Sequence, residues 1–140
     1  MSYLLDTCVI SELIKKNPEA AVIQWLESTD ESSTYVSVLS VGEIQKGIAK
    51  LTPSRRKQAL TEWLEKDLKT RFAKRFLDFD ILSALKWGEV LGAQEKKGIN
   101  IPLMDSLIAA TSLVHSLTVV TRNGKDMENM GVEIVNPWTE

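Results

Sequence analysis

Four residues with oxygen-donor side chains stand where strand patterns give way to helix patterns. Asp6 ends the apolar run "YLL", and Asn123 follows the β-branched run "LTVVT". Glu43 lies in the helix pattern after "TYVSV", and Asp105 opens the helix pattern of "PLMDSLIAATS". Ligand sites in open α/β sheets form at the carboxyl ends of the strands. We therefore expect these four side chains to converge on one site.

Converging carboxylates with no basic partner in their own motifs repel each other, and a divalent cation relieves that repulsion. Oxygen ligands favour Mg²⁺ or Mn²⁺ over zinc, which prefers nitrogen and sulfur. His115 and Cys8 are the only histidine and cysteine, so a site built from several histidines is excluded. We expect the Cys8 thiol to be inert. A carboxylate-bound Mg²⁺ that keeps its waters can present a nucleophile to a phosphodiester.

Each acid also has an ordinary structural explanation. Aspartate is a favoured helix N-cap, so capping alone accounts for Asp6 and for Asp105 when each is taken singly. The letters "SVGE" spell a capping box that would engage Glu43. However, the apolar stripe of that helix begins at Val38, which places the cap nearer Ser37. The convergence of the acids, and not any one position, favours chemistry.

Three neighbours of these residues are candidates for auxiliary roles. We expect Thr7 to orient Asp6, or to cap the following helix through its hydroxyl so that Asp6 is left for a metal. Thr121 ends the "LTVVT" run beside Asn123. Asp126 lies shortly beyond, where a structural role in a loop is favoured.

Strand and helix patterns alternate along the 140 residues. Apolar and β-branched runs predict strands at 3–5, 34–38, 75–80, 117–121 and 132–135. Helical spacing predicts helices at 9–14, 18–28, 38–51, 53–72, 81–97 and 104–116. This alternation implies right-handed crossovers and a parallel sheet covered on both faces. We expect a single α/β domain over residues 1–140.

Composition and charge constrain the location and the partners. No apolar run approaches the ~20 residues of a membrane span, and no signal peptide is visible, so we expect a cytoplasmic protein. The net charge of -2 does not indicate nucleic-acid binding by itself. Any RNA affinity would come from local cations. The candidates are Arg122, Lys125, Lys46, Lys50 and the clusters at 54–57 and 69–75, although ordinary solvated helix faces also explain these clusters.

Four motifs, in this order, carry a family resemblance: "LLDTCVISEL", "VLSVGEIQKGIAKL", "PLMDSLIAATS" and "VVTRNGKDM". Together with the ending "GVEIVNPW" they resemble the PIN-domain ribonucleases, in particular the VapC/FitB toxins of bacterial toxin–antitoxin pairs. The resemblance implies a three-layer PIN-like fold with a central parallel sheet of about five strands flanked by helices. It also implies an Mg²⁺- or Mn²⁺-dependent endoribonuclease that cleaves structured, tRNA-like RNA. The implied partners are a VapB/FitA-like antitoxin and a second copy of the chain, in a homodimer or a toxin–antitoxin hetero-oligomer.

The resemblance carries over residue by residue. Asp6, Glu43 and Asp105 match the three core acids of the family, which are the implied metal ligands. Asn123 stands where the fourth position is often Asp, so we expect weaker affinity, especially for a second metal ion. Asp126 is the candidate substitute. Many relatives have Asn where this chain has Cys8.

Two other functions stay open. A phosphotransferase or phosphatase of the haloacid dehalogenase type also begins with Asp after an apolar strand, but it needs a second Asp where this chain has Cys8. A catalytically weak PIN-fold module that binds protein is the second alternative, and Asn123 keeps it open. The apolar faces of the helices at 18–28 and 53–72 are the candidate dimer surfaces.

Overall fold

Five short parallel strands form the centre of the computed structural model, which describes residues 1–139. The strands are β1 (Tyr3–Leu5), β2 (Thr34–Ser37), β3 (Phe76–Leu77), β4 (Thr118–Val120) and β5 (Ile134–Val135). Their order across the sheet is β3-β2-β1-β4-β5, and every neighbouring pair is parallel. The predicted α/β architecture with a parallel sheet of about five strands is confirmed.

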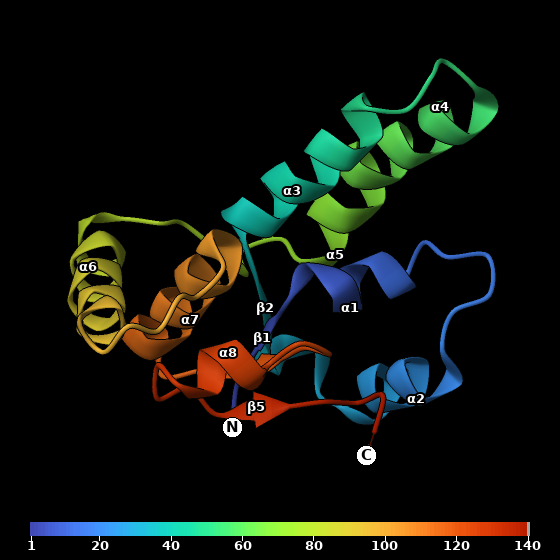
Figure 1. Cartoon of the computed structure of the whole chain (residues 1–140). Helices are drawn as coiled ribbons and strands as arrows, with labels where there is room; N and C mark the ends of the chain where they lie inside the picture. The colour runs from blue at the N-terminus through green and yellow to red at the C-terminus, as the bar shows by residue number, and fades with distance from the viewer. Residues whose placement is uncertain (140) are drawn as a thin grey trace.

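Helical segments connect consecutive strands and cover both faces of the sheet (Figure 1). Between β1 and β2 lie α1 (Thr7–Glu12), α2 (Ala20–Ser28) and the 3-10 turn η1 (Glu31–Ser33). Between β2 and β3 lie α3 (Val38–Ala49), α4 (Arg55–Glu62), the π-helical segment η2 (Trp63–Leu68) and α5 (Lys69–Arg71). The later connections are α6 (Ile81–Lys96), α7 (Leu103–His115) and α8 (Lys125–Glu128).

Two hydrophobic cores lie on opposite faces of the sheet, because successive residues of a strand point to opposite faces. Leu5 and Val120 belong to the core that α1, α2, α3 and η2 cover. Leu4 and Val119 belong to the core that α7 and α8 cover. All four side chains are fully buried. Strands buried on both faces read as continuous apolar runs, which is the pattern of "LTVV" in the sequence.

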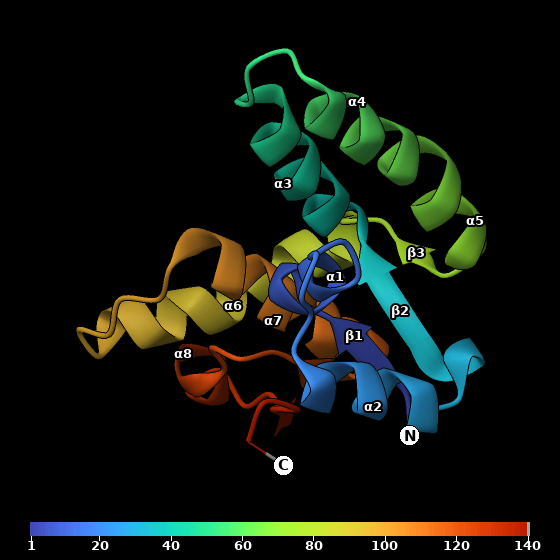
Figure 2. The ribbon, with the colours of Figure 1, turned by 90° about the vertical axis from the view of Figure 1, so that its right-hand side faces the viewer.

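The antiparallel helices α3 and α4 project from the sheet as an arm (Figure 2). Ser37 is the N-cap of α3, and its hydroxyl accepts a hydrogen bond from the backbone N–H of Leu39 at 3.0 Å. This confirms the predicted cap and leaves Glu43 in the second turn. Leu64 and Leu68 anchor the return limb of the arm in the core. The apolar faces predicted as dimer surfaces at 18–28 and 53–72 are therefore largely used inside the molecule.

The predicted strand at 75–80 is too long, because only Phe76 and Leu77 pair with β2. The side chain of Asp80 accepts a hydrogen bond from the backbone N–H of Ser83 at 3.0 Å and starts α6. The alternation of apolar and acidic residues that predicted a strand therefore continues into the short connection between β3 and α6, which is not a strand. No helix within residues 1–139 combines the length and the apolar character needed to cross a bilayer.

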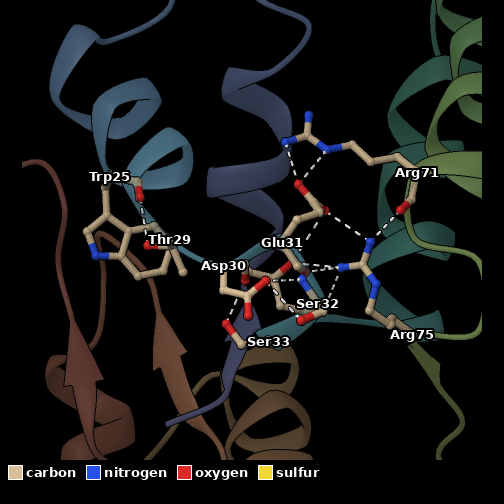
Figure 3. A network of polar contacts seen from close by, with 9 residues as sticks. Trp25, Thr29, Asp30, Glu31, Ser32, Ser33, Arg71 and Arg75 are labelled. Atoms are coloured by element: carbon tan, nitrogen blue, oxygen red, sulfur yellow. Dashed lines mark hydrogen bonds and ion pairs between the residues drawn. The ribbon is translucent and has the colours of Figure 1, made fainter.

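A polar network ties the start of β2 to the segment that enters β3 (Figure 3). Arg75 donates from Nη1 to the carbonyl oxygens of Glu31 and Thr34, at 2.6 Å and 2.7 Å. Its Nη2 pairs with the Glu31 carboxylate at 3.0 Å, and Arg71 pairs with the other oxygen of that carboxylate at 3.1 Å. The Arg75 guanidinium also lies over the Phe72 ring, 4.9 Å from its centroid. Two cations of the 69–75 cluster are thus engaged inside the protein.

Replacing Arg75 and Arg71 separately should have unequal effects on stability. Arg75→Met removes a largely buried cation from several acceptors, and we expect the free energy of unfolding to fall by about 2–3 kcal/mol. Arg71→Met removes an exposed pair, and the loss should stay below about 1 kcal/mol. Urea denaturation measures both values. Equal losses in the two variants would contradict this account of the network.

Candidate active site

The carboxyl ends of β1 and β4 lie side by side at the centre of the sheet. After these ends the backbone continues in opposite directions across the sheet, because β1 is followed by β2 on one side and β4 is followed by β5 on the other. The backbone N–H of Asp6 donates to the carbonyl oxygen of Val120 at 3.0 Å and holds the two ends together. Such a reversal of strand order is where open α/β sheets bind ligands.

Asp6 is the N-cap of α1 and is also a buried residue of this edge, with 8% of its surface exposed. Its Oδ1 accepts from the backbone N–H of Thr7 at 2.8 Å, and its Oδ2 accepts from the Thr121 hydroxyl at 2.8 Å. Thr7 therefore helps to orient Asp6 as expected, but through its backbone N–H, and the alternative that its hydroxyl caps the helix is wrong. Within residues 1–139 that hydroxyl is buried and has no hydrogen-bond partner. Extended backbone angles place Asp6, and not Thr7, in the capping position.

Thr121 is the residue whose side chain orients Asp6. It is fully buried, and its hydroxyl also accepts from the backbone N–H of Asn123 at 3.1 Å. The Cys8 sulfur lies 3.6 Å from the same hydroxyl oxygen. One side chain therefore links the end of β4, the start of α1 and the loop that carries Asn123. The sequence signal for this role was weak, since Thr121 reads as one more β-branched residue of its strand.

The four predicted oxygen donors line one cleft, with a volume of about 310 Å³. Asp6 comes from the end of β1, Glu43 from the second turn of α3, and Asn123 from the loop after β4. Asp105 lies in the first turn of α7, where an acid is favoured by the helix dipole. The cleft is completed by Thr7, Cys8, Ser11 and Met104. The structure thus brings together all four side chains that the sequence placed at strand ends.

The cleft is electrostatically unfavourable for its own acids. Burial raises the pKa of Asp6, against hydrogen bonds from Thr121 and Thr7, and the negative charge of Glu43 raises this pKa further. Burial and the charges of Asp6, Asp126 and Glu43 raise the pKa of Asp105 to about 6. No ion pair within residues 1–139 involves any of the three acids of the cleft. The site is an acidic cluster without an internal counter-ion.

The donor set matches a hard, hydrated cation. Among residues 1–139, no three acidic, histidine or cysteine side chains approach closely enough to hold one ion directly. Mg²⁺ keeps several waters and needs only one or two protein carboxylates, so direct contact with all three acids is not required. Asp6 and Asp105 are the residues that would hold such an ion, because burial raises the pKa of both carboxyls and the charge of Asp6 raises that of Asp105 further.

The other predicted site residues lie outside the lining of the cleft. Asp126 lies in α8 and not in a loop as expected, and it is half-buried and acts on Asp105 only through its charge. Lys46 and Lys125 are exposed on α3 and at the start of α8. Arg122 is exposed as well, and its guanidinium lies 5.0 Å from the centroid of the Trp138 ring.

Cys8 is half-buried, because it packs against the core on one side and lines the cleft on the other. Burial raises the pKa of this thiol, and the charge of Asp6 raises it further, against hydrogen bonding at the Arg122 backbone and at Thr121. A thiol held in its neutral form is a poor nucleophile. The expectation of an unreactive thiol therefore agrees with its surroundings.

The fold and the site define a parallel α/β protein with an acidic cleft at the point where strand order reverses. Comparison with known proteins adds the family, since the PIN domain model matches residues 3–133. Toxin FitB of Neisseria gonorrhoeae is 37% identical, over 96% of this chain and 97% of its own length. The VapC ribonuclease Y4jK of Sinorhizobium fredii is 33% identical over 96% of both chains.

Solved structures agree with these sequence matches. The crystal structure of FitAcB from Neisseria gonorrhoeae superposes with a TM-score of 0.93, at 36% identity and over 99% of both chains. VapBC2 from Rickettsia felis, bound to a DNA fragment from its promoter, gives a TM-score of 0.80 at 25% identity, over 97% of this chain and 98% of that one. The chain belongs to the PIN-domain family, as the four motifs of the sequence indicated.

Removing the Thr121 hydroxyl should destabilise the protein in a pH-dependent way. Thr121→Val takes a hydrogen bond from a buried carboxylate, so we expect a loss of about 1–3 kcal/mol in the free energy of unfolding. The lost bond stabilises ionised Asp6 and holds its pKa down. The loss should therefore be full at about pH 8 and should shrink as the pH falls through the raised pKa of Asp6, because the protonated carboxyl no longer needs that bond. Thr121→Ser, which keeps the hydroxyl, is the control, and a loss independent of pH would contradict the assignment.

Neutralising Asp105 should stabilise the protein without metal above about pH 6. The folded protein holds the pKa of Asp105 at about 6, above its ordinary value of 3.8, so ionisation costs stability as the pH rises between these values. Asp105→Asn does not ionise. Its melting temperature in EDTA should match that of the wild type at about pH 4 and exceed it at about pH 8. A constant difference across this range would show that ionisation of the partly buried Asp105 carboxyl is not the cause.

Proposed function

We propose that this protein is a divalent-metal-dependent endoribonuclease toxin, neutralised by a cognate antitoxin. The observation that supports this most strongly is the cleft at the centre of the sheet edge. It gathers Asp6, Glu43, Asp105 and Asn123, and no lysine or arginine of the described residues lines it. The matched relatives named as toxins and VapC ribonucleases point to the same activity.

Each residue of the cleft has a distinct task in this proposal. A bound Mg²⁺ or Mn²⁺ would supply an activated water and stabilise the leaving oxygen of a phosphodiester. Asp6 would hold the ion through a carboxylate whose orientation Thr121 and the N–H of Thr7 fix. Asp105 would be the second carboxylate that holds the ion, whose positive charge would offset the burial and the neighbouring charges that raise its pKa without metal. Asn123 contributes an amide oxygen and adds no charge.

The substrate in this proposal is structured RNA of the tRNA type. The acids of the cleft repel phosphate, so affinity must come from cations around it. Lys46, Lys125 and Arg122 are exposed near the elements that carry the acids, although none lines the cleft. Binding through such cations weakens steeply as salt rises.

The antitoxin and the second copy each have a candidate surface. An apolar hollow of about 380 Å³ lies between α3 and η2, and it suits apolar side chains of the antitoxin. Its lining consists of Val38, Val41, Leu64, Leu68, Lys69 and Phe76. The homodimer would use the exposed apolar side chains at the start of α6 and α7, which are Ile81, Leu82, Leu85 and Leu103. Exposed apolar clusters of this kind mark protein interfaces.

A catalytically weak, protein-binding member of the family is the second candidate function. Asn123 favours it, since an amide lines the cleft at the position where the family often has an acid. In that case Asn123→Asp would restore neither metal binding nor cleavage. In the ribonuclease proposal the same change adds a fourth carboxylate and should strengthen metal binding.

Replacing either of two acids should abolish the activity. We expect Asp6→Asn and Asp105→Asn to lower cleavage of total tRNA by roughly 100-fold or more, and to remove growth inhibition on induced expression. Asp67→Asn is the matched control, because that acid is exposed on η2 and away from the cleft. Full toxicity and full cleavage in both site variants would refute the proposed function.

A further inference from the structure

The loop between β4 and α8 carries Asn123 to the acidic cleft. Asn123 is exposed and is the fourth oxygen donor in the lining of the cleft. Its backbone N–H donates to the Thr121 hydroxyl at 3.1 Å. An amide oxygen carries no net charge, so it attracts a cation only at short range and must be held within roughly 0.5 Å of its working position. The support of this loop therefore decides whether Asn123 can act as a donor.

Gly124 makes the first contact between this loop and the 134–138 segment, which comprises β5 and the turn after it. A Cβ at Gly124 would lie 2.5 Å from Cγ2 of Ile134, which is closer than packed atoms approach. A Cβ at any other glycine within residues 1–139 would meet no non-neighbouring atom within 4 Å. The missing side chain at Gly124 is therefore what lets β5 pack closely against the loop.

Asn136 makes the second contact with the loop. Its Oδ1 accepts from the backbone N–H of Trp138 at 2.9 Å, and its Nδ2 donates to the carbonyl oxygen of Arg122 at 3.4 Å. The backbone N–H of Thr139 donates to the carbonyl oxygen of Asn136 at 3.2 Å, which closes a turn. One amide side chain therefore shapes the turn after β5 and joins it to the residue before Asn123.

Trp138 makes the third contact. The guanidinium of Arg122 lies over its ring, 5.0 Å from the centroid. Trp138 is half-buried and packs against the core that α1 and α2 help to cover, whereas Arg122 is exposed. An anchored ring thus restrains an exposed cation through a cation–π contact. Ile134, Asn136 and Trp138 are alternate residues of one segment, and each contacts a residue that flanks Asn123.

We infer that the 134–138 segment positions Asn123 in the cleft. It restrains the residue before Asn123 through Asn136 and Trp138, and the residue after it through Ile134. These three are positioning residues, because none of them lines the cleft. The inference rests on the proposed function, in which Asn123 contributes an oxygen to a divalent cation. It adds that this contribution is set by residues that touch neither the ion nor the substrate.

Calorimetric titration with Mn²⁺ in the absence of RNA tests the inference. Trp138→Leu removes the ring beneath Arg122, and Gly124→Ala pushes the loop away from β5. Each should weaken Mn²⁺ binding roughly tenfold, as the loss of a contact behind a metal ligand does. Trp63→Leu and Gly92→Ala make matched changes on η2 and α6, away from the loop, and should bind Mn²⁺ like the wild type. Trp138→Phe keeps an aromatic ring for Arg122 and should restore most of the affinity.

Repeating one change in an Asn123→Ala background separates positioning from general damage. If Trp138 acts through Asn123, Trp138→Leu should cause no further loss of Mn²⁺ affinity in that background, because coupled residues do not act additively. The same fold-loss in both backgrounds would overturn the inference. Unchanged affinity in both Trp138→Leu and Gly124→Ala, with a wild type that binds Mn²⁺, would also overturn it and leave the proposed function standing.

Hydrogen exchange of the Asn123 backbone N–H, followed by NMR in EDTA, gives a readout that depends on neither metal binding nor cleavage. Exchange should be roughly tenfold faster in Trp138→Leu and Gly124→Ala than in the wild type, because the bond to Thr121 opens more often. The N–H of Asp6, which joins the two central strands, should keep its wild-type rate. This result supports the inference even where the wild type binds no Mn²⁺ and the proposed function fails. Unchanged exchange at Asn123 in both variants would overturn it.

Discussion

The hydrogen bond from Thr121 to Asp6 is the contact on which the site depends, because it joins the two central strands at the point where strand order reverses. It places a buried carboxylate at the centre of the sheet edge and fixes one of its oxygens. The backbone N–H of Thr7 fixes the other oxygen. Asp6 is thus a helix cap and a cleft residue at once, and its two roles use the same geometry. Glu43 and Asp105 reach the cleft because α3 and α7 also begin near that edge.

The second constraint is the repulsion among these acids. Burial and neighbouring charges raise the pKa of both Asp6 and Asp105, so the folded chain without metal carries an electrostatic cost. Proteins accept such costs at functional sites, where local rules are broken for a purpose.

The architecture and the convergence of the four oxygen-donor side chains could both be predicted from the sequence. Strand runs and helical spacing place Asp6, Asn123 and Asp105 at one sheet edge. The sequence was insufficient for Thr7, since Asp and Thr both cap helices and only the backbone angles decide between them. It also missed the Arg75 network, whose partner Glu31 lies 44 residues away. Glu12 is a further example. This buried acid accepts from the N–H of Glu19 at 2.9 Å, and no local pattern signals that contact.

The central claim is that the acidic cleft binds a divalent cation, and calorimetric titration of the purified protein with Mn²⁺ tests it most directly. The account predicts saturable binding at neutral pH to the wild type. It also predicts much weaker binding to Asp6→Asn, and weaker binding to Thr121→Val, which leaves the acids in place but removes the clamp on Asp6. Absence of Mn²⁺ binding to the wild type, or equal binding to Asp6→Asn, would contradict it.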